Sequence, residues 1–279
     1  MIKIHKDLNL SKYTYTKQNI VVKNFIELDN IDLLTPLLKY YKKFIFIGNC
    51  SKTLFAFNNK DICLIRYVKK DIKIISNLLL IDSGASLSSI GEFALCNGIA
   101  GFEKIMTIPG FLGGSVYNNA SCFNQEICEN ILFVEVYDTS DNKIKILKKD
   151  ECEFGYRKSI FQNNQYLILR VIFRIKKALG LVLKNNLSNV IKLRNLSQPK
   201  GISYGSTFKN YGVLKARELV GNLNVESYDK VTLSKINSNF IILDFNFDYI
   251  NIVKLIERIN ELLYNKLGIT LESEIKIFY

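Results

Sequence analysis

The segment 105–120 reads IMTIPGFLGGSVYNNA, and a proline and three glycines fall within six of its positions, from Pro109 to Gly114. Proline fixes φ and lacks an N–H donor, whereas glycine accepts positive φ and close backbone approach. Such a loop can point several backbone N–H groups at one anion, for example a pyrophosphate. An ordinary buried turn explains the same residues equally well, so this segment alone leaves both interpretations open.

A second small-residue turn precedes this segment in the chain. The apolar stretch 44–47 leads directly into Gly48-Asn49-Cys50-Ser51-Lys52-Thr53. A strand that ends in such a turn can hold a phosphate, although a single G-N-x-S sequence is weak evidence. The turn is therefore a second candidate for phosphate binding.

The composition is that of a globular protein. The chain has 279 residues, enough for two or three small domains, with 48% hydrophobic and 23% charged residues. No run approaches the roughly 18 apolar residues of a membrane span. The amino terminus has no apolar core of a secretory signal. We therefore expect a cytoplasmic protein without membrane insertion.

Cysteine and histidine usage limits the chemistry. Six cysteines form no C-x-x-C pair, and His5 is the single histidine. We therefore expect no metal site, and free, mostly packed thiols in a reducing compartment. A general acid or base in this chain must be Ser, Tyr, Lys, Cys, Asp or Glu.

The net charge of +12 is compatible with binding nucleic acid or anionic small molecules. Lysine is scattered without a dominant basic block, which favours a solvated basic surface over a nucleic-acid patch. We therefore expect no nucleic-acid partner. An enzyme with several phosphorylated ligands would also benefit from this field.

Periodic apolar patterns predict an α+β protein with much sheet. Capping residues mark two helices, one begun by Ser86 and one begun by Asp248 with Gly268 after its end. The predicted elements are a strand pair over 18–30, a strand over 44–47, a helix over 86–96, a hairpin of 131–137 with 143–147, a helix over 182–200, a helix over 249–267 and a strand over 269–279.

Two further motifs carry chemical groups. Gly155-Tyr156-Arg157-Lys158-Ser159-Ile160-Phe161 has a polar centre between aromatic ends, and an arginine fork suits a carboxylate. A structural salt bridge would explain this arginine equally well. Gly205-Ser206-Thr207-Phe208-Lys209-Asn210 places a serine after a glycine, and the plain alternative is a turn entering a strand.

These four motifs, together with L-E-x-E-I at 271–275, occur in one order that resembles the UDP-N-acetylenolpyruvoylglucosamine reductase family. Members of that family are flavoenzymes that make UDP-N-acetylmuramate for bacterial cell walls. The resemblance covers roughly residues 18 to 279. The short chain is similar to the compact form of the family.

The resemblance implies a two-part FAD-binding domain of the vanillyl-alcohol-oxidase-like type and a C-terminal α+β substrate-binding domain. On this basis residues 1–185 bind FAD, in subdomains of about 1–60 and 61–185. Residues 186–279 bind the substrate, and the last strand, near 270–279, returns to the active site. We expect a monomer.

The resemblance also implies the reaction. NADPH reduces FAD, and hydride then passes to the methylene carbon of a UDP-sugar enolpyruvate while the adjacent carbon is protonated. This addition moves charge onto the neighbouring carboxylate, so the site needs donors there and one acid. By the family motifs, Arg157 and Glu274 stabilise the resulting intermediate and Ser206 delivers the proton.

Binding residues follow from the same motifs. The expected FAD contacts are Gly48, Asn49, Cys50, Ser51, Lys52, Thr53, Ile108, Pro109, Gly110, Gly113, Gly114, Ser115 and Asn119. The expected substrate contacts are Tyr156, Arg157, Gly205, Lys209 and Asn210.

The chain departs from the family pattern at several positions. Cys50 replaces a usual glycine and Lys52 a usual asparagine. A positive φ at Cys50 would cost about 1 kcal/mol or more, whereas Lys52 can compensate by facing a phosphate. The remaining departures are Ser121 for glycine, Asn237 for histidine and Lys276 for arginine. The three expected catalytic residues are intact, which favours an active enzyme.

Two alternatives stay open at this point. Another FAD oxidoreductase on the same flavin domain would share the two glycine loops but would not need Arg157, Ser206 and Glu274 together. A catalytically inactive homologue would act as a binding protein, for nucleic acid in view of the charge. Salt-dependent DNA binding without flavin absorbance would favour the latter.

Overall fold

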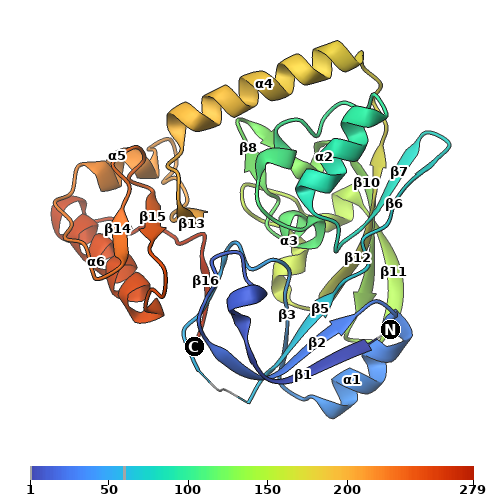
Figure 1. Cartoon of the computed structure of the whole chain (residues 1–279), viewed down its shortest axis with the longest axis horizontal. Coiled ribbons are helices and arrows are strands. Elements are labelled where there is room, and N and C mark those ends of the chain that lie inside the picture. Colours follow the sequence, from blue (N-terminus) through green and yellow to red (C-terminus); the bar gives the residue numbers. More distant parts are fainter. Residues whose placement is uncertain (1, 59–60) are drawn as a thin grey trace. The chain divides into compact units, whose positions relative to one another are not determined.

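A computed structural model describes residues 2–58 and 61–279, which fall into two compact units (Figure 1). The first unit consists of Met1–Leu8, Val22–Asn49 and Asp61–Lys192, and the second of Asn9–Val21, Cys50–Lys60 and Leu193–Tyr279. Each unit is therefore assembled from three separate stretches of sequence. The division passes through the turn 48–53, between Asn49 and Cys50.

The helices of the described residues include both α-helices and short 3-10 turns. The α-helices are α1 (Leu34–Tyr40), α2 (Leu87–Cys96), α3 (Leu112–Tyr117), α4 (Gly180–Ser197), α5 (Ala216–Gly221) and α6 (Tyr249–Leu267). The 3-10 turns are Leu10–Lys12, Ile31–Leu33, Ile105–Thr107, Ile127–Asn130, Lys149–Cys152 and Ile160–Asn163.

Two larger sheets form the first unit. In the four-stranded sheet the order is β1 (Ile2–Asn9), β2 (Val21–Leu28), β5 (Cys63–Tyr67) and β3 (Phe44–Phe46). In the five-stranded antiparallel sheet the order is β11 (Lys143–Lys148), β10 (Ile131–Asp138), β12 (Tyr166–Arg174), β7 (Leu78–Asp82) and β6 (Ile72–Ile75). A small hairpin joins β8 (Ser121–Cys122) to β9 (Gln125–Glu126).

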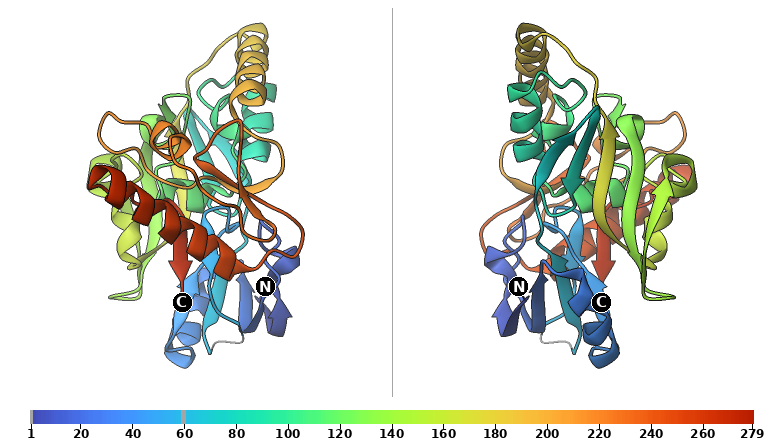
Figure 2. Two further views of the ribbon diagram at one scale, coloured as in Figure 1. Left: turned by 90° about the vertical axis from the view of Figure 1, so that its left-hand side faces the viewer. Right: turned by 90° about the vertical axis from the view of Figure 1, so that its right-hand side faces the viewer.

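The inner strands of the five-stranded sheet are packed on both faces, whereas the outer strands β6 and β11 are largely exposed. Helices α2 and α3 cover one face, where Ile90 and Val116 pack against Val134 and Val171 (Figures 1 and 2). On the other face, side chains of β10 and β12 share a core with the four-stranded sheet and α1. This arrangement fixes the loop before α3 at one end of a rigid sheet.

The second unit packs α6 against a three-stranded sheet with the order β13 (Ile202–Ser206), β15 (Phe240–Leu243) and β14 (Val231–Leu233). Five apolar residues on one face of α6 are buried: Ile252, Leu255, Ile256, Ile259 and Leu263. A two-stranded parallel sheet pairs β4 (Thr53–Phe55) with β16 (Lys276–Phe278). The end of the chain is thereby joined to the strand after the turn 48–53.

Most predicted elements are confirmed, and the capping residues are placed as expected. The Ser86 side chain accepts a hydrogen bond from the Ser89 N–H at the start of α2, and Asp248 accepts one from the Ile250 N–H at the start of α6. Gly268 ends α6 with φ +68°.

Two strand predictions are wrong in extent. Only one strand, β2, lies within 18–30, and the strand beside it, β1, precedes this range. Of 269–279 only Lys276–Phe278 is a strand. The Asn260 side chain bonds both backbone groups of Leu271, at 2.8 and 3.1 Å, and so replaces strand pairing there.

The predicted free thiols are confirmed. All six cysteines lie in the described residues and none forms a disulfide; all except Cys96 are buried. Burial raises the pKa of the Cys63 and Cys152 thiols to about 12, so these groups stay protonated at neutral pH. They serve packing rather than proton transfer.

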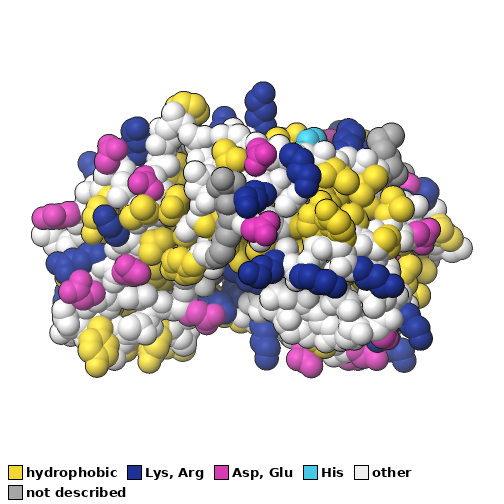
Figure 3. All heavy atoms as spheres, turned by 90° about the horizontal axis from the view of Figure 1, so that it is seen from below, with side chains coloured by type: hydrophobic (Ala, Val, Ile, Leu, Met, Phe, Trp, Pro, Cys, Tyr) yellow, Lys and Arg dark blue, Asp and Glu magenta, His cyan; other side chains and the backbone are white. Residues whose placement is uncertain are grey.

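Charged side chains are interspersed on the surface. On the face shown in Figure 3, Lys and Arg lie among acidic, neutral and hydrophobic side chains. None of the helices within 2–58 and 61–279 combines the length and the hydropathy needed to cross a bilayer.

Candidate active site

The two glycine loops of the first unit lie side by side at Gly48 and Gly114. A Cβ placed on Gly48 would be 3.9 Å from the Gly114 Cα and N atoms. A Cβ placed on Gly114 would meet no atom within 4 Å. The missing side chain of Gly114 therefore leaves room for another molecule beside the first turn, as a cofactor cradle requires.

Gly113 has a different role, because it packs against its own unit. A Cβ at this position would lie 3.0 Å from the Ser83 Cβ, and the Gly113 N–H donates to the Ser83 carbonyl at 2.9 Å. The Leu112 N–H donates likewise to the Ala85 carbonyl, and the Ser115 hydroxyl to the Phe111 carbonyl. These bonds dock the start of α3 onto the end of β7.

The remaining residues of the loop 105–120 are packed against neighbouring segments of the first unit. Ile108 and Pro109 are half-buried, and the Gly110 carbonyl accepts from the Leu87 N–H at 3.0 Å. Asn119 is fully buried, and its amide donates to the Gly155 carbonyl and to Glu126, each at 2.9 Å. Asn119 therefore links this loop to the turn that carries Arg157.

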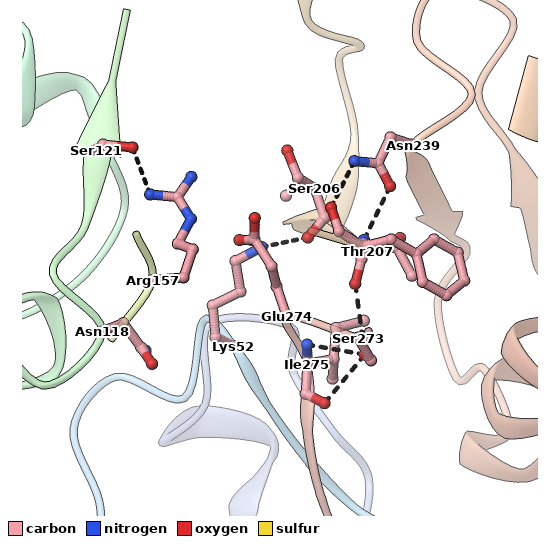
Figure 4. A network of polar contacts seen from close by, with 12 residues as sticks. Lys52, Asn118, Ser121, Arg157, Ser206, Thr207, Asn239, Ser273, Glu274 and Ile275 are labelled. Carbon is pink, nitrogen blue, oxygen red and sulfur yellow. Dashed lines mark hydrogen bonds and ion pairs between the residues drawn. The ribbon is translucent and has the colours of Figure 1, made fainter. Parts of the chain in front are cut away.

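Arg157 lies in a tight turn closed by reciprocal backbone bonds between Gly155 and Lys158, each 3.1 Å long. Its backbone has φ +54°, an uncommon value for a residue with a side chain. The guanidinium donates to the Ser121 hydroxyl and lies 5.7 Å from the centre of the exposed Tyr156 ring (Figure 4). Such an outlier, held by surrounding bonds, is typical of functional sites.

Cys50 begins the part of the first turn that belongs to the second unit. It is buried and has φ +54°, so the positive φ considered from the sequence is present. Ser51, Lys52 and Thr53 follow and lead into β4. The expected strain is therefore a real feature of this turn.

The second unit brings together Lys52, Ser206 and Glu274. The Lys52 ammonium lies 3.1 Å from Glu274 Oε2 and donates to the backbone carbonyl of Ser206 (Figure 4). The Glu274 N–H donates to the Thr207 carbonyl at 2.7 Å, and the Lys276 N–H to the Lys52 carbonyl at 2.9 Å. Three distant segments are thus connected through their backbones.

Asn239 fixes the strand end that carries Ser206. This buried side chain accepts from the Phe208 N–H and donates to the Phe208 carbonyl, both at 2.9 Å. The Asn237 side chain in turn accepts from the Asn239 N–H at 3.1 Å. Sequence analysis missed Asn239, although a polar residue directly before the buried strand 240–243 was a usable signal.

The expected substrate residues of the second unit flank this cluster. Gly205 has φ +71°, which favours glycine. The Lys209 ammonium lies 2.6 Å from Glu272 Oε1, and Asn210 accepts from the Ala216 N–H at the start of α5. Tyr204 is buried, and this burial raises the pKa of its phenol, so it stays neutral. The substrate contacts of Gly205, Lys209 and Asn210 stay predictions.

Comparisons with known proteins agree along the whole chain. A family model, the C-terminal domain of UDP-N-acetylenolpyruvoylglucosamine reductase, matches residues 198–278. The UDP-N-acetylenolpyruvoylglucosamine reductase of Pseudothermotoga lettingae is 30% identical over 280 residues, which cover 99% of this chain and 98% of the relative. That of Thermosipho melanesiensis is 32% identical over 264 residues, 92% of this chain and 89% of the relative.

A solved structure shares the fold. The crystal structure of UDP-N-acetylenolpyruvylglucosamine reductase from Thermus caldophilus has a TM-score of 0.86 and 22% identity, and the match covers all of both chains.

The α+β fold, the glycine loops of the first unit and the relatives define an FAD-dependent oxidoreductase. The chain belongs to the UDP-N-acetylenolpyruvoylglucosamine reductase family. The family, fold class, enzyme class and cofactors predicted from the sequence are thereby confirmed.

Proposed function

We propose that this protein reduces UDP-N-acetylglucosamine enolpyruvate to UDP-N-acetylmuramate with NADPH, in the synthesis of bacterial peptidoglycan precursors. Family membership along the whole chain supports this activity. The observation that carries it is the cluster of the second unit, in which the Glu274 carboxylate and the strand end with Ser206 share the Lys52 ammonium. An inactive binding homologue would not need these groups together.

The reaction adds a hydride and a proton, together two electrons and two protons, across one carbon–carbon double bond. FAD, when bound, takes hydride from NADPH and supplies it to the methylene carbon. Arg157 donates hydrogen bonds to the substrate carboxylate, which gains negative charge as the double bond is lost. The Ser206 hydroxyl gives its proton to the carbon beside that carboxylate and regains one from solvent. Glu274 helps to stabilise the intermediate that exists after hydride addition and before protonation.

The residues present fit an FAD cofactor. The volume left open beside Gly114 and its position against Gly48 form a cradle that a Cβ would fill. We propose that the pyrophosphate lies there, and that Gly48, Asn49, Ile108 and Pro109 line it. Gly113 and Ser115 shape the cradle through their bonds to Ser83 and Phe111.

Gly114→Val is expected to remove bound FAD while leaving the fold intact. The valine side chain enters the open volume instead of a packed core and sterically excludes FAD, so the purified variant should retain little or no flavin. The measurement is the flavin absorbance per protein together with the thermal unfolding of the FAD-free protein. Gly180→Val is the matched control, because a Cβ at Gly180 also meets no atom within 4 Å. Stoichiometric flavin in folded Gly114→Val would contradict this placement.

The proposed activity is tested by anaerobic spectroscopy of the purified protein. Yellow flavin absorbance is expected to bleach with NADPH and to return when UDP-N-acetylglucosamine enolpyruvate is added. The product should be heavier than the substrate by two hydrogens. Bleaching without recovery would indicate another FAD oxidoreductase, and salt-dependent DNA binding without flavin would indicate a binding homologue.

We also propose that the protein works as a monomer in the cytoplasm. The free thiols, including the exposed Cys96, fit a reducing compartment, where both NADPH and UDP-sugars are available. Light scattering should give the mass of one chain at micromolar concentration. A stable mass of two chains would refute the monomer.

A further inference from the structure

Lys52 is a departure from the family motif that the structure places beside the catalytic groups of the second unit. Its ammonium lies 3.1 Å from Glu274 Oε2 and also donates to the Ser206 backbone carbonyl (Figure 4). One side chain therefore contacts both segments that carry the expected catalytic residues of the second unit.

Because the Lys52–Glu274 ion pair is largely buried, the loss of either partner should have a measurable energetic effect. The Glu274 side chain is 6% exposed and that of Lys52 is 25% exposed. A carboxylate so far from water is costly unless a cation or several donors contact it. Exposed ion pairs contribute little, but removing one partner of a buried pair leaves the other charge uncompensated.

The Lys52 ammonium lies directly beside Gly205. A Cβ placed on this glycine would be in ordinary van der Waals contact with Lys52 Nζ, at 3.5 Å. The Lys52 carbonyl accepts from the Lys276 N–H at 2.9 Å, which fixes the base of the side chain. The lysine side chain reaches from the residue before β4 to the end of β13. The asparagine of the family motif is shorter and carries no positive charge.

We propose that Lys52 is a positioning residue of the substrate half-reaction. It holds the Glu274 carboxylate in one orientation and anchors the strand end that carries Ser206. This role replaces the phosphate contact expected for Lys52 from its place in the turn. The inference rests on the proposed function, because only that reaction uses Glu274 and Ser206.

A double-mutant cycle tests the ion pair without any turnover. Lys52→Met, Glu274→Gln and the double variant are compared by thermal unfolding with saturating FAD. Lys52→Met should lower Tm by about 3 to 6 °C alone, but by less than about 1 °C when Glu274 is already glutamine. Lys254→Met, an exposed lysine on α6, is the matched control and should leave Tm unchanged. Equal losses in both backgrounds would overturn the pairing.

Stopped-flow measurement of the two half-reactions tests the role. In Lys52→Met, reoxidation of the flavin by the enolpyruvyl substrate should slow about 10- to 100-fold, while reduction by NADPH and FAD affinity change less than about threefold. Lys52→Arg should recover most of the rate, and Lys52→Asn should not. Unchanged reoxidation, or a parallel loss of FAD affinity and of both half-reactions, would overturn the proposal. The second result would assign Lys52 to a phosphate.

A different result would show that the proposed function itself is wrong. The reduced wild-type flavin would then not be reoxidised by the enolpyruvyl substrate at all, and the positioning role would fall with it. The double-mutant cycle would still report whether Lys52 and Glu274 are coupled.

Discussion

Ser206→Ala is expected to slow flavin reoxidation by the enolpyruvyl substrate by about a thousandfold or more, equivalent to roughly 4 kcal/mol of transition-state stabilisation. Gly205, with φ +71°, and the Asn239 side chain fix the strand end that presents this hydroxyl. Alanine keeps nearly the same volume, and the Lys52 bond goes to the backbone carbonyl, which alanine retains. Folding and flavin content should therefore barely change.

The measurement separates the two half-reactions by stopped-flow absorbance. Reduction by NADPH should proceed at a near-normal rate, because it does not need the serine proton. Ser206→Cys should recover part of the loss, since a thiol is more acidic but larger. Ser197→Ala removes a hydroxyl from α4 and is the control. Reoxidation of Ser206→Ala within tenfold of wild type would mean that water or Glu274 supplies the proton.

Arg157→Ala is expected to lower turnover by about a thousandfold, in the range that follows loss of a donor to a developing oxyanion. The turn that carries it is closed by its own backbone bonds between Gly155 and Lys158, so removal of the guanidinium leaves the turn in place. FAD should remain bound and reducible by NADPH.

Variants at neighbouring positions define the guanidinium's role. Lys158→Ala removes a cation from the same turn and should leave turnover near the wild-type value. Arg157→Lys keeps the charge but loses the planar fork, and should recover only a small part of the rate. An equal collapse of NADPH-driven flavin reduction in Arg157→Ala would contradict a role confined to the substrate.

Local signals in the sequence were sufficient for most elements. Helix α6 follows from its apolar period and from Asp248 and Gly268 at its ends, because capping and periodicity depend only on near neighbours. The Ser86 cap of α2 follows in the same way. The family could be predicted from five motifs that are each weak alone, because five such motifs rarely occur in the same order by chance.

Long-range partners were beyond the sequence. Asn119 is fully buried and donates to the distant Gly155 carbonyl, and the Asn260 side chain bonds the backbone of Leu271 in place of a strand partner. The pairing of Lys52 with Glu274 joins positions near opposite ends of the chain. No local pattern encodes such contacts, because they exist only after the surrounding segments have folded.

The parallel pairing of β4 with β16 has a consequence for biosynthesis. These two strands are separated by most of the chain, so their contact order is high and the loop between them must close late. Until the segment with Glu274 and β16 has been synthesised, β4 lacks this strand partner and Lys52 lacks the Glu274 carboxylate. The first unit can gather its sheets co-translationally. The pairing of Lys52 with Glu274 therefore forms only after β16 has been synthesised, so a nascent chain stalled before β16 lacks this pairing however well its earlier part has folded.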